Sequence, residues 1–196
     1  MLGKNRVVVL VALALVLGGL GAAGCGGAGV SIIRTDLAPG ALSRADALVF
    51  KAVDPSATEF AGDFSDDPPS VAANRETLRT TYAAKAASSV QAAGFKAEVL
   101  AEGAAPADGA VVVEMVVKKF EAGSNASRVV WGFGAGASYL LTDVKLLKGG
   151  NTVADFTIDA TSGGRGGFSG IGNFLVEHID DSVAQLAAFL SEKVPQ

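Results

Sequence analysis

Residues 139–160 read YLLTDVKLLKGGNTVADFTIDA, and this stretch decides the fold. Two runs of alternating apolar and polar side chains flank the tetrapeptide Lys148-Gly149-Gly150-Asn151. Such alternation is typical of half-buried β-strands, and a glycine pair between two such runs favours a tight turn. The apolar positions on one side are Leu140, Val144, Leu146, Ala154, Phe156, Ile158 and Ala160. The stretch therefore predicts an antiparallel hairpin with one apolar face.

The end of the chain supplies a partner for that face. A helix is predicted from about Gly170 to Val194, because large aliphatic side chains recur there at three- and four-residue steps. They are Ile171, Leu175, Ile179, Val183, Leu186 and Leu190. This continuous apolar stripe predicts that the helix packs on the hairpin.

Three further strands are predicted before the hairpin, over Ala47–Val53, Phe95–Ala101 and Val111–Val117, because each alternates apolar with polar residues. Residues 31–35 also suit a short strand. A second helix is predicted over Val71–Ala93. Its expected start has Asp66, Asp67 and two prolines, its face includes Leu78, Tyr82, Ala86 and Val90, and Gly94 ends it.

The predicted order is strand, helix, four strands and helix. A strand-helix-strand unit followed by a meander and a closing helix favours an α+β fold. We therefore expect a single two-layer domain over residues 46–196, with a mixed sheet of about five strands and two main helices packed on one face.

The first 24 residues are typical of an export signal. Lys4 and Arg6 precede the apolar run Val7–Leu20, and the small residues Gly21-Ala22-Ala23-Gly24 lead to Cys25. A cysteine directly after such a site resembles the bacterial lipoprotein signal, in which that cysteine is lipidated and becomes the new N-terminus. We predict a signal peptide over residues 1–24, and a lipidated N-terminus and tether over 25–45.

Two other interpretations of the leader stay open. Ala22 stands where the common lipoprotein motif has leucine, and Ala-Ala-Gly also suits ordinary signal cleavage, which would release a soluble exported protein. An uncleaved membrane span would use the uncharged stretch between Arg6 and Arg34. A span needs roughly 20 apolar residues, however, and the run becomes glycine-rich after Leu17.

Composition narrows the class of protein further. The chain has 196 residues and a formal net charge of −4, and Lys4 and Arg6 are the only charges of the leader. The remaining chain is therefore more acidic, which argues against nucleic acid or an anionic lipid surface as the main partner. Cys25 is the only cysteine, so the chain forms no intramolecular disulfide.

Two glycine-rich stretches are candidate contact sites. Trp131–Ser138 has glycines spaced G-x-G-x-G, which matches neither a dinucleotide fingerprint nor a P-loop. It favours a glycine-rich hairpin or bulged strand, with a partner surface at Arg128, Trp131 and Phe133 as the alternative. Ser162–Gly170 precedes the last helix, where Arg165 and Ser169 could hold an anion beside free backbone N–H groups, unless the loop is simply solvated.

No motif indicates catalysis, a metal or a cofactor. The chain has no G-x-S-x-G, no S-x-x-K and no Cys-His pair within the domain, so we expect no enzymatic activity. Its single histidine, His178, is expected at the margin of the last helix, paired with Asp181. Asp63, Asp66 and Asp67 lack the spacing of a calcium loop and are expected to solvate the loop and cap the helix.

Residues 123–190 resemble an uncharacterised family of bacterial lipoproteins known as a domain of unknown function. The resemblance is carried by short glycine patterns and the last helix, namely Gly123-Ser124, Arg128, Gly132-Phe133-Gly134-Ala135-Gly136, Gly163–Gly167 and the helix from Ile171. It implies an envelope lipoprotein and supplies no activity. Gly26 after Cys25 resembles the pattern that permits export to the outer membrane.

These observations predict a non-enzymatic lipoprotein, held in the outer membrane by palmitate-type acyl chains on Cys25 and facing the periplasm. We expect it to act through contacts with an envelope protein, in an assembly or accessory role, without nucleic acid. The alternative function is a binding module for an anionic envelope ligand at Arg165 and Ser169.

Overall fold

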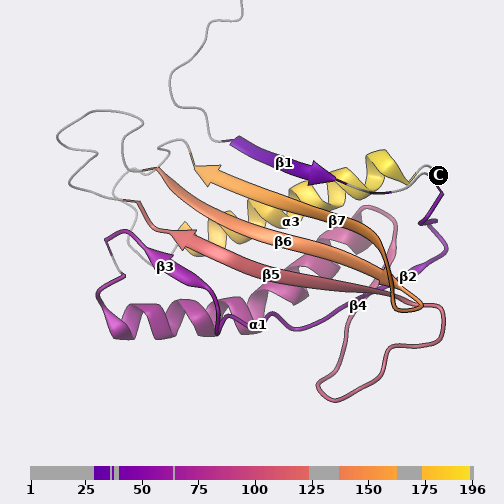
Figure 1. Ribbon diagram of the computed structural model, residues 1–196, viewed down its shortest axis with the longest axis horizontal. Helices are drawn as coiled ribbons and strands as arrows, with labels where there is room; N and C mark the ends of the chain where they lie inside the picture. The colour runs from indigo at the N-terminus through magenta and orange to yellow at the C-terminus, as the bar shows by residue number, and fades with distance from the viewer. Residues whose placement is uncertain are drawn as a thin grey trace, which may run out of the picture.

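The computed structural model describes residues 29–35, 37, 40–63, 65–123, 137–162 and 174–194 (Figure 1). These residues form seven strands and two helices. In chain order they are β1 (Gly29–Thr35), β2 (Ala47–Phe50), β3 (Glu59–Ala61), α1 (Pro68–Ala92), β4 (Lys96–Val99), β5 (Val111–Glu121), β6 (Ser138–Lys148), β7 (Asn151–Ser162) and α3 (Phe174–Lys193).

The strands form one open mixed sheet in the order β1-β7-β6-β5-β2-β4. Strand β2 pairs with the first residues of β5, and β3 pairs with the last three residues of β5. The pairs β1–β7, β7–β6 and β6–β5 are antiparallel. Strand β2 is parallel to both β4 and β5, and β3 is parallel to β5. The mixed sheet is confirmed, but its seven strands exceed the predicted number of about five. The short strand over residues 31–35 is present as β1, and the three residues of β3 are too few to show an alternating pattern.

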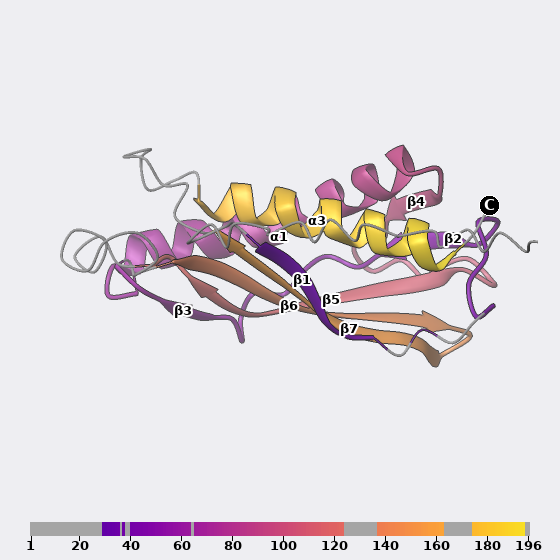
Figure 2. The same ribbon diagram turned by 90° about the horizontal axis from the view of Figure 1, so that it is seen from above.

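Both helices lie on the same side of the sheet (Figure 2). Helix α1 packs on β2 and β4, α3 packs on β1, β6 and β7, and the two helices contact each other. The buried residues form one cluster between the helices and the sheet. The opposite face of the sheet is covered by no described element (Figure 2).

Local sequence explains where α1 begins and ends. The side chain of Asp67 accepts a hydrogen bond from the backbone N–H of Ser70, and prolines occupy the first two helical positions. This arrangement satisfies free N–H groups at the helix start. Gly94 follows the helix with a φ of +88°, a conformation that glycine adopts without strain. The cap at Asp67 and the stop at Gly94 are therefore confirmed, whereas the helix begins at Pro68, three residues before the predicted Val71.

The β6–β7 hairpin closes as the sequence predicts. Gly149 and Gly150 both have positive φ, as a two-residue type I′ turn requires. Lys148 pairs with Asn151, and further along Val144 pairs with Phe156. The seven apolar side chains predicted for one face are all at most 1% exposed. A one-residue register shift lies between Leu147 and Leu146, and beyond it all seven side chains face the core.

Helix α3 covers this face with a wide apolar stripe. Leu175, Ile179, Leu186 and Leu190 are each at most 2% exposed. The ring of Phe189 packs on that of Phe156 from β7, with 4.5 Å between the ring centroids. The helix is integral to the core although it lies near the end of the chain.

The burial of α3 predicts a large loss of stability on truncating its central leucine. Leu186→Ala should lower the free energy of unfolding by about 2–5 kcal/mol, because it removes buried methyl groups and leaves a cavity. Glu192→Ala is the control on the same helix, since Glu192 is exposed and pairs with its neighbour Lys193, and it should change stability by less than about 0.5 kcal/mol. Urea unfolding followed by circular dichroism measures both. Equal effects of the two substitutions would show that the helix is peripheral.

Candidate functional site

The residues predicted to carry contacts lie outside the described part of the chain. They are Cys25, Arg128, Trp131, Phe133, Arg165 and Ser169. The described residues on either side of the two glycine-rich stretches do meet, because Ser138 pairs with Ser162. Both stretches are therefore attached at the same end of the sheet, and the anion-binding alternative stays a prediction.

At this end of the sheet, His178 is buried in the core. It comes from the second turn of α3, is 1% exposed, and its Nε2 lies 2.9 Å from Oγ of Ser138 on β6. The edge of the Phe120 ring packs against the imidazole, with 6.2 Å between the centroids. Nδ1 of His178 has no hydrogen-bond partner among the described residues.

The prediction that His178 lies at the helix margin and pairs with Asp181 is wrong. The buried stripe of α3 is wider than the predicted aliphatic one, and it includes His178 and Ser182. Burial lowers the pKa of His178, because water no longer stabilises the imidazolium, while the negative charges of Asp181 and Asp159 act in the opposite direction. The imidazole is therefore neutral at pH 7 in the folded protein.

A second buried polar group joins three elements. The hydroxyl of Tyr82 on α1 donates to Oγ1 of Thr142 on β6, at 3.0 Å, and lies 2.5 Å from Oγ of Ser182 on α3. All three side chains are at most 1% exposed. A phenol has one proton to donate, so Ser182 donates to Tyr82. Burial raises the pKa of Tyr82, which keeps the phenol neutral.

The geometry of these groups favours a structural role. Ser138 and His178 have the separation of a nucleophile and its base, but both side chains are buried, and the described residues leave no approach to the Ser138 hydroxyl. Nδ1 also lacks a described carboxylate that would orient the ring. What the arrangement does is fix the positions of α1 and α3 on the sheet.

The sequence carried a signal for these residues. Ser138 and Thr142 share the period-two positions of Leu140, Val144 and Leu146, which places them on the buried face of β6. His178 and Ser182 follow Leu175 at steps of three and four residues, which places them on the buried face of α3. The positions of these polar residues within the apolar stripes of β6 and α3 therefore predict that their side chains are buried.

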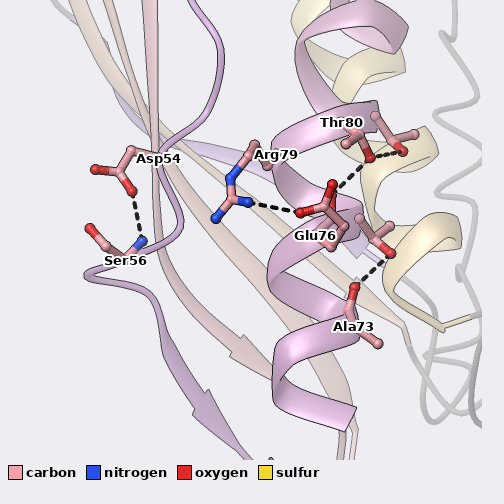
Figure 3. Close-up of polar contacts among 8 residues, drawn as sticks. Asp54, Ser56, Ala73, Glu76, Arg79 and Thr80 are labelled. Carbon is pink, nitrogen blue, oxygen red and sulfur yellow. Dashed lines mark hydrogen bonds and ion pairs between the residues drawn. The ribbon is translucent and has the colours of Figure 1, made fainter. Parts of the chain in front are cut away.

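Polar contacts also cover the exposed face of α1 (Figure 3). Nη1 of Arg79 lies 2.8 Å from Oε2 of Glu76, and Asp54 on the neighbouring loop accepts a hydrogen bond from the backbone N–H of Ser56. That hydrogen bond is the main cause of the lowered pKa of Asp54, and the positive charge of Arg79 adds to it. Exposed pairs of this kind contribute little to stability.

An open groove runs between the helices on the side away from the sheet. Its lining comes mostly from small and hydroxyl-bearing residues of α1, namely Thr80, Thr81, Ala84, Ser88 and Ser89, together with Val183 of α3. Lys85 and Asp180 form an ion pair across it, with 2.5 Å between Nζ and Oδ1. The groove has no buried charged group that would mark a specific ligand.

Within the described ranges, no three or more His, Cys, Asp and Glu side chains converge to hold a metal ion. Neither described helix combines the length and the apolar character that crossing a bilayer demands.

The sequence and fold were compared with known proteins. The family model of a domain of unknown function, DUF4410, matches residues 30–167. The chain belongs to the DUF4410 family. The prediction of an uncharacterised domain is thereby confirmed. A comparison with curated proteins gives no match.

Solved structures similar to this chain include a PelC dodecamer from Paraburkholderia phytofirmans, which is 16% identical over 86% of this chain and 100% of that chain, with a TM-score of 0.46. An uncharacterised protein is 13% identical over 77% of this chain and 92% of its own, with a TM-score of 0.45. A Xanthomonas campestris protein of the DUF330 family is 13% identical over 80% of this chain and 89% of its own, with a TM-score of 0.41.

The buried neutral state of His178 predicts a pH-dependent stability. The pKa of His178 in the folded protein lies below the ordinary value of 6.5, so protons bind preferentially to the unfolded chain as the pH falls below that value. The urea midpoint should therefore fall between about pH 7 and about pH 5. The lowered pKa values of Asp46 and Asp54 change stability only below their ordinary value of 3.8.

The control for this prediction is His178→Gln, which retains a donor for Ser138 and does not titrate. Its midpoint should change less over the same pH range than that of the wild type. Parallel pH profiles of the two proteins would contradict the assignment.

Proposed function

We propose that the protein is an exported lipoprotein, anchored by acyl chains on Cys25 in the outer membrane and facing the periplasm, that acts through contacts with another envelope protein. The observation that carries this proposal is the leader. Lys4 and Arg6, the apolar run Val7–Leu20 and the small residues before Cys25 form the three parts of an export signal in their usual order. Gly26 after Cys25 favours the outer membrane.

The position of β1 supports the anchor. This strand begins at Gly29, four residues after Cys25, and is an edge strand of the sheet. Because Cys25 precedes the first strand, a lipid attached to it can tether the domain while the acyl chains stay outside the hydrophobic core. The leader and the folded part are thus adjacent in the sequence and do not overlap.

The uncovered face of the sheet supports a protein partner. By the uncovered face we mean the outward side chains of β5, β6 and β7, among them Val116, Tyr139, Leu141, Asp143 and Lys145. Val116 is 46% exposed, whereas its neighbours Met115 and Val117 point inward and are buried. An apolar side chain this exposed on a face that no described element covers is available for contact with another protein, and non-obligate interfaces are about as apolar as the rest of a protein surface.

Metabolic labelling tests the anchor. When the full chain is expressed in a bacterium fed a labelled fatty acid, the wild type should carry the label, and Cys25→Ser, which removes the thiol that accepts the lipid, should carry none. Absence of label on the wild type, or equal label on both proteins, would refute the lipoprotein assignment.

Photo-crosslinking tests the contact surface. A photo-reactive residue in place of Val116 on the uncovered face should give a discrete crosslinked product in intact cells, because that side chain would lie in the interface. The matched control replaces Ala84, which is exposed on α1 on the opposite side of the domain. It should give no such product. The same product at both positions, or none at Val116, would contradict a partner on this face.

A further inference from the structure

We infer that the end of the sheet at Gly29 is the part of the domain that faces the membrane, and that the hairpin turn at Gly149 and Gly150 points away from it. The inference rests on the lipid anchor proposed above. It specifies how the anchored domain is oriented, because the position of β1 in the sheet determines which end of the domain is attached to the lipid.

The strand register identifies this end. Gly29 pairs with Thr161 near the end of β7, and Val30 pairs with Ala160. At the same end Ser138 begins β6 opposite Ser162, and Glu121 ends β5 opposite Tyr139. Figure 1 shows the start of β1, the ends of β5 and β7 and the start of α1 together on the left. We call this region the Gly29 end.

The chain between Cys25 and β1 is short. Four residue steps separate Cys25 from Gly29, and even a fully extended chain covers at most about 14 Å in that distance. Strand β7 has 12 residues and spans about 36 Å. The anchor therefore reaches less than half the length of the sheet, so it holds the Gly29 end close to the bilayer and places no such limit on the far turn.

Pairing keeps β1 in place under this constraint. From Gly29 to Thr35, β1 is paired with β7, apart from a bulge at Ile33. Ile32 is half-buried and packs against the core opposite Ile158, which is 1% exposed. Detaching β1 to lengthen the tether would break these pairs and expose Ile32, so the folded domain favours the short tether.

The charges at the Gly29 end do not favour electrostatic attraction to an anionic membrane. Carboxylates lie there on β3, on the loop before α1 and on the end of β5, namely Glu59, Asp63, Asp66, Asp67 and Glu121. Lys119 lies among them and is paired with Glu59 at 2.9 Å and with Glu121 at 3.7 Å. Among the described residues this end carries more carboxylates than cations, the latter including Arg75 beside Phe60 of β3. Such a surface is not attracted to anionic lipids, so we attribute the proximity to the covalent tether.

Fluorescence quenching tests the orientation in the full lipidated protein. A fluorophore is attached through Thr161→Cys at the Gly29 end or through Asn151→Cys at the far turn, since the thiol of Cys25 is occupied by the lipid. The protein is placed in vesicles of phosphatidylethanolamine and phosphatidylglycerol that carry nitroxide-labelled headgroups. We expect quenching at position 161 and little at position 151.

A tether variant serves as the matched control. Inserting 20 Gly and Ser residues between Gly26 and Gly27 gives a flexible chain with a root-mean-square reach of about 25 Å. It should reduce quenching at position 161 toward the value at 151. The unlipidated Cys25→Ser chain should not sediment with the vesicles, and its sedimentation would overturn the conclusion that the tether imposes the proximity.

The outcomes separate this inference from the proposed function. Mass spectrometry of the same samples shows whether Cys25 carries lipid. Equal quenching at the two positions, or stronger quenching at 151, in lipidated protein would overturn the orientation and leave the lipoprotein proposal standing. Absence of lipid would overturn the lipoprotein proposal and the orientation with it.

Discussion

The burial of one face of the sheet under α1 and α3 is the constraint on which the rest of the structure depends. Each large apolar side chain buried there contributes roughly 1.5–3 kcal/mol, in a domain whose net stability is typically about 5–15 kcal/mol. A shift of one residue in the hairpin register would turn this whole set toward water. The turn at Gly149 and Gly150, the register shift beside it and the stripe of α3 therefore act together to bury this face.

Polar groups within that face make its arrangement specific. Apolar contacts tolerate small slides of one helix over another, whereas a buried hydroxyl that loses its partner costs about 1–3 kcal/mol. The contacts of Tyr82 with Thr142 and Ser182 are satisfied when α1, α3 and β6 lie in one relative position. The contact of His178 with Ser138 likewise fixes the position of the start of α3 on β6. Specificity in this core thus comes from hydroxyls and one neutral imidazole.

Sequence reasoning succeeded where structure depends on neighbouring residues. Local periodicity and turn chemistry predict both helices, the hairpin, the strands from β2 onward except β3, and the cap at Asp67.

The sequence predicts less where strand pairing depends on distant segments. Strand β3 has three residues and exists because β5 offers it an edge, and the insertion of β2 between β4 and β5 leaves no local pattern. The burial of His178 is not evident from the aliphatic stripe alone, because a polar residue in such a stripe is usually expected at its margin. The residues predicted for contacts lie outside the described part of the chain.

The pairing of β1 with β7 also bears on the order in which the sheet forms. The β6–β7 hairpin closes through two residues, an event on the scale of about 1–10 μs for isolated hairpins. Strand β1 precedes all the others in the chain yet pairs with the last of them, so Gly29 meets Thr161 only by closing a loop that contains most of the domain. The entropy of that closure delays such distant contacts. We therefore expect the N-terminal edge to be the last part of the sheet to form, and to open at a lower free energy than the β5–β6–β7 meander.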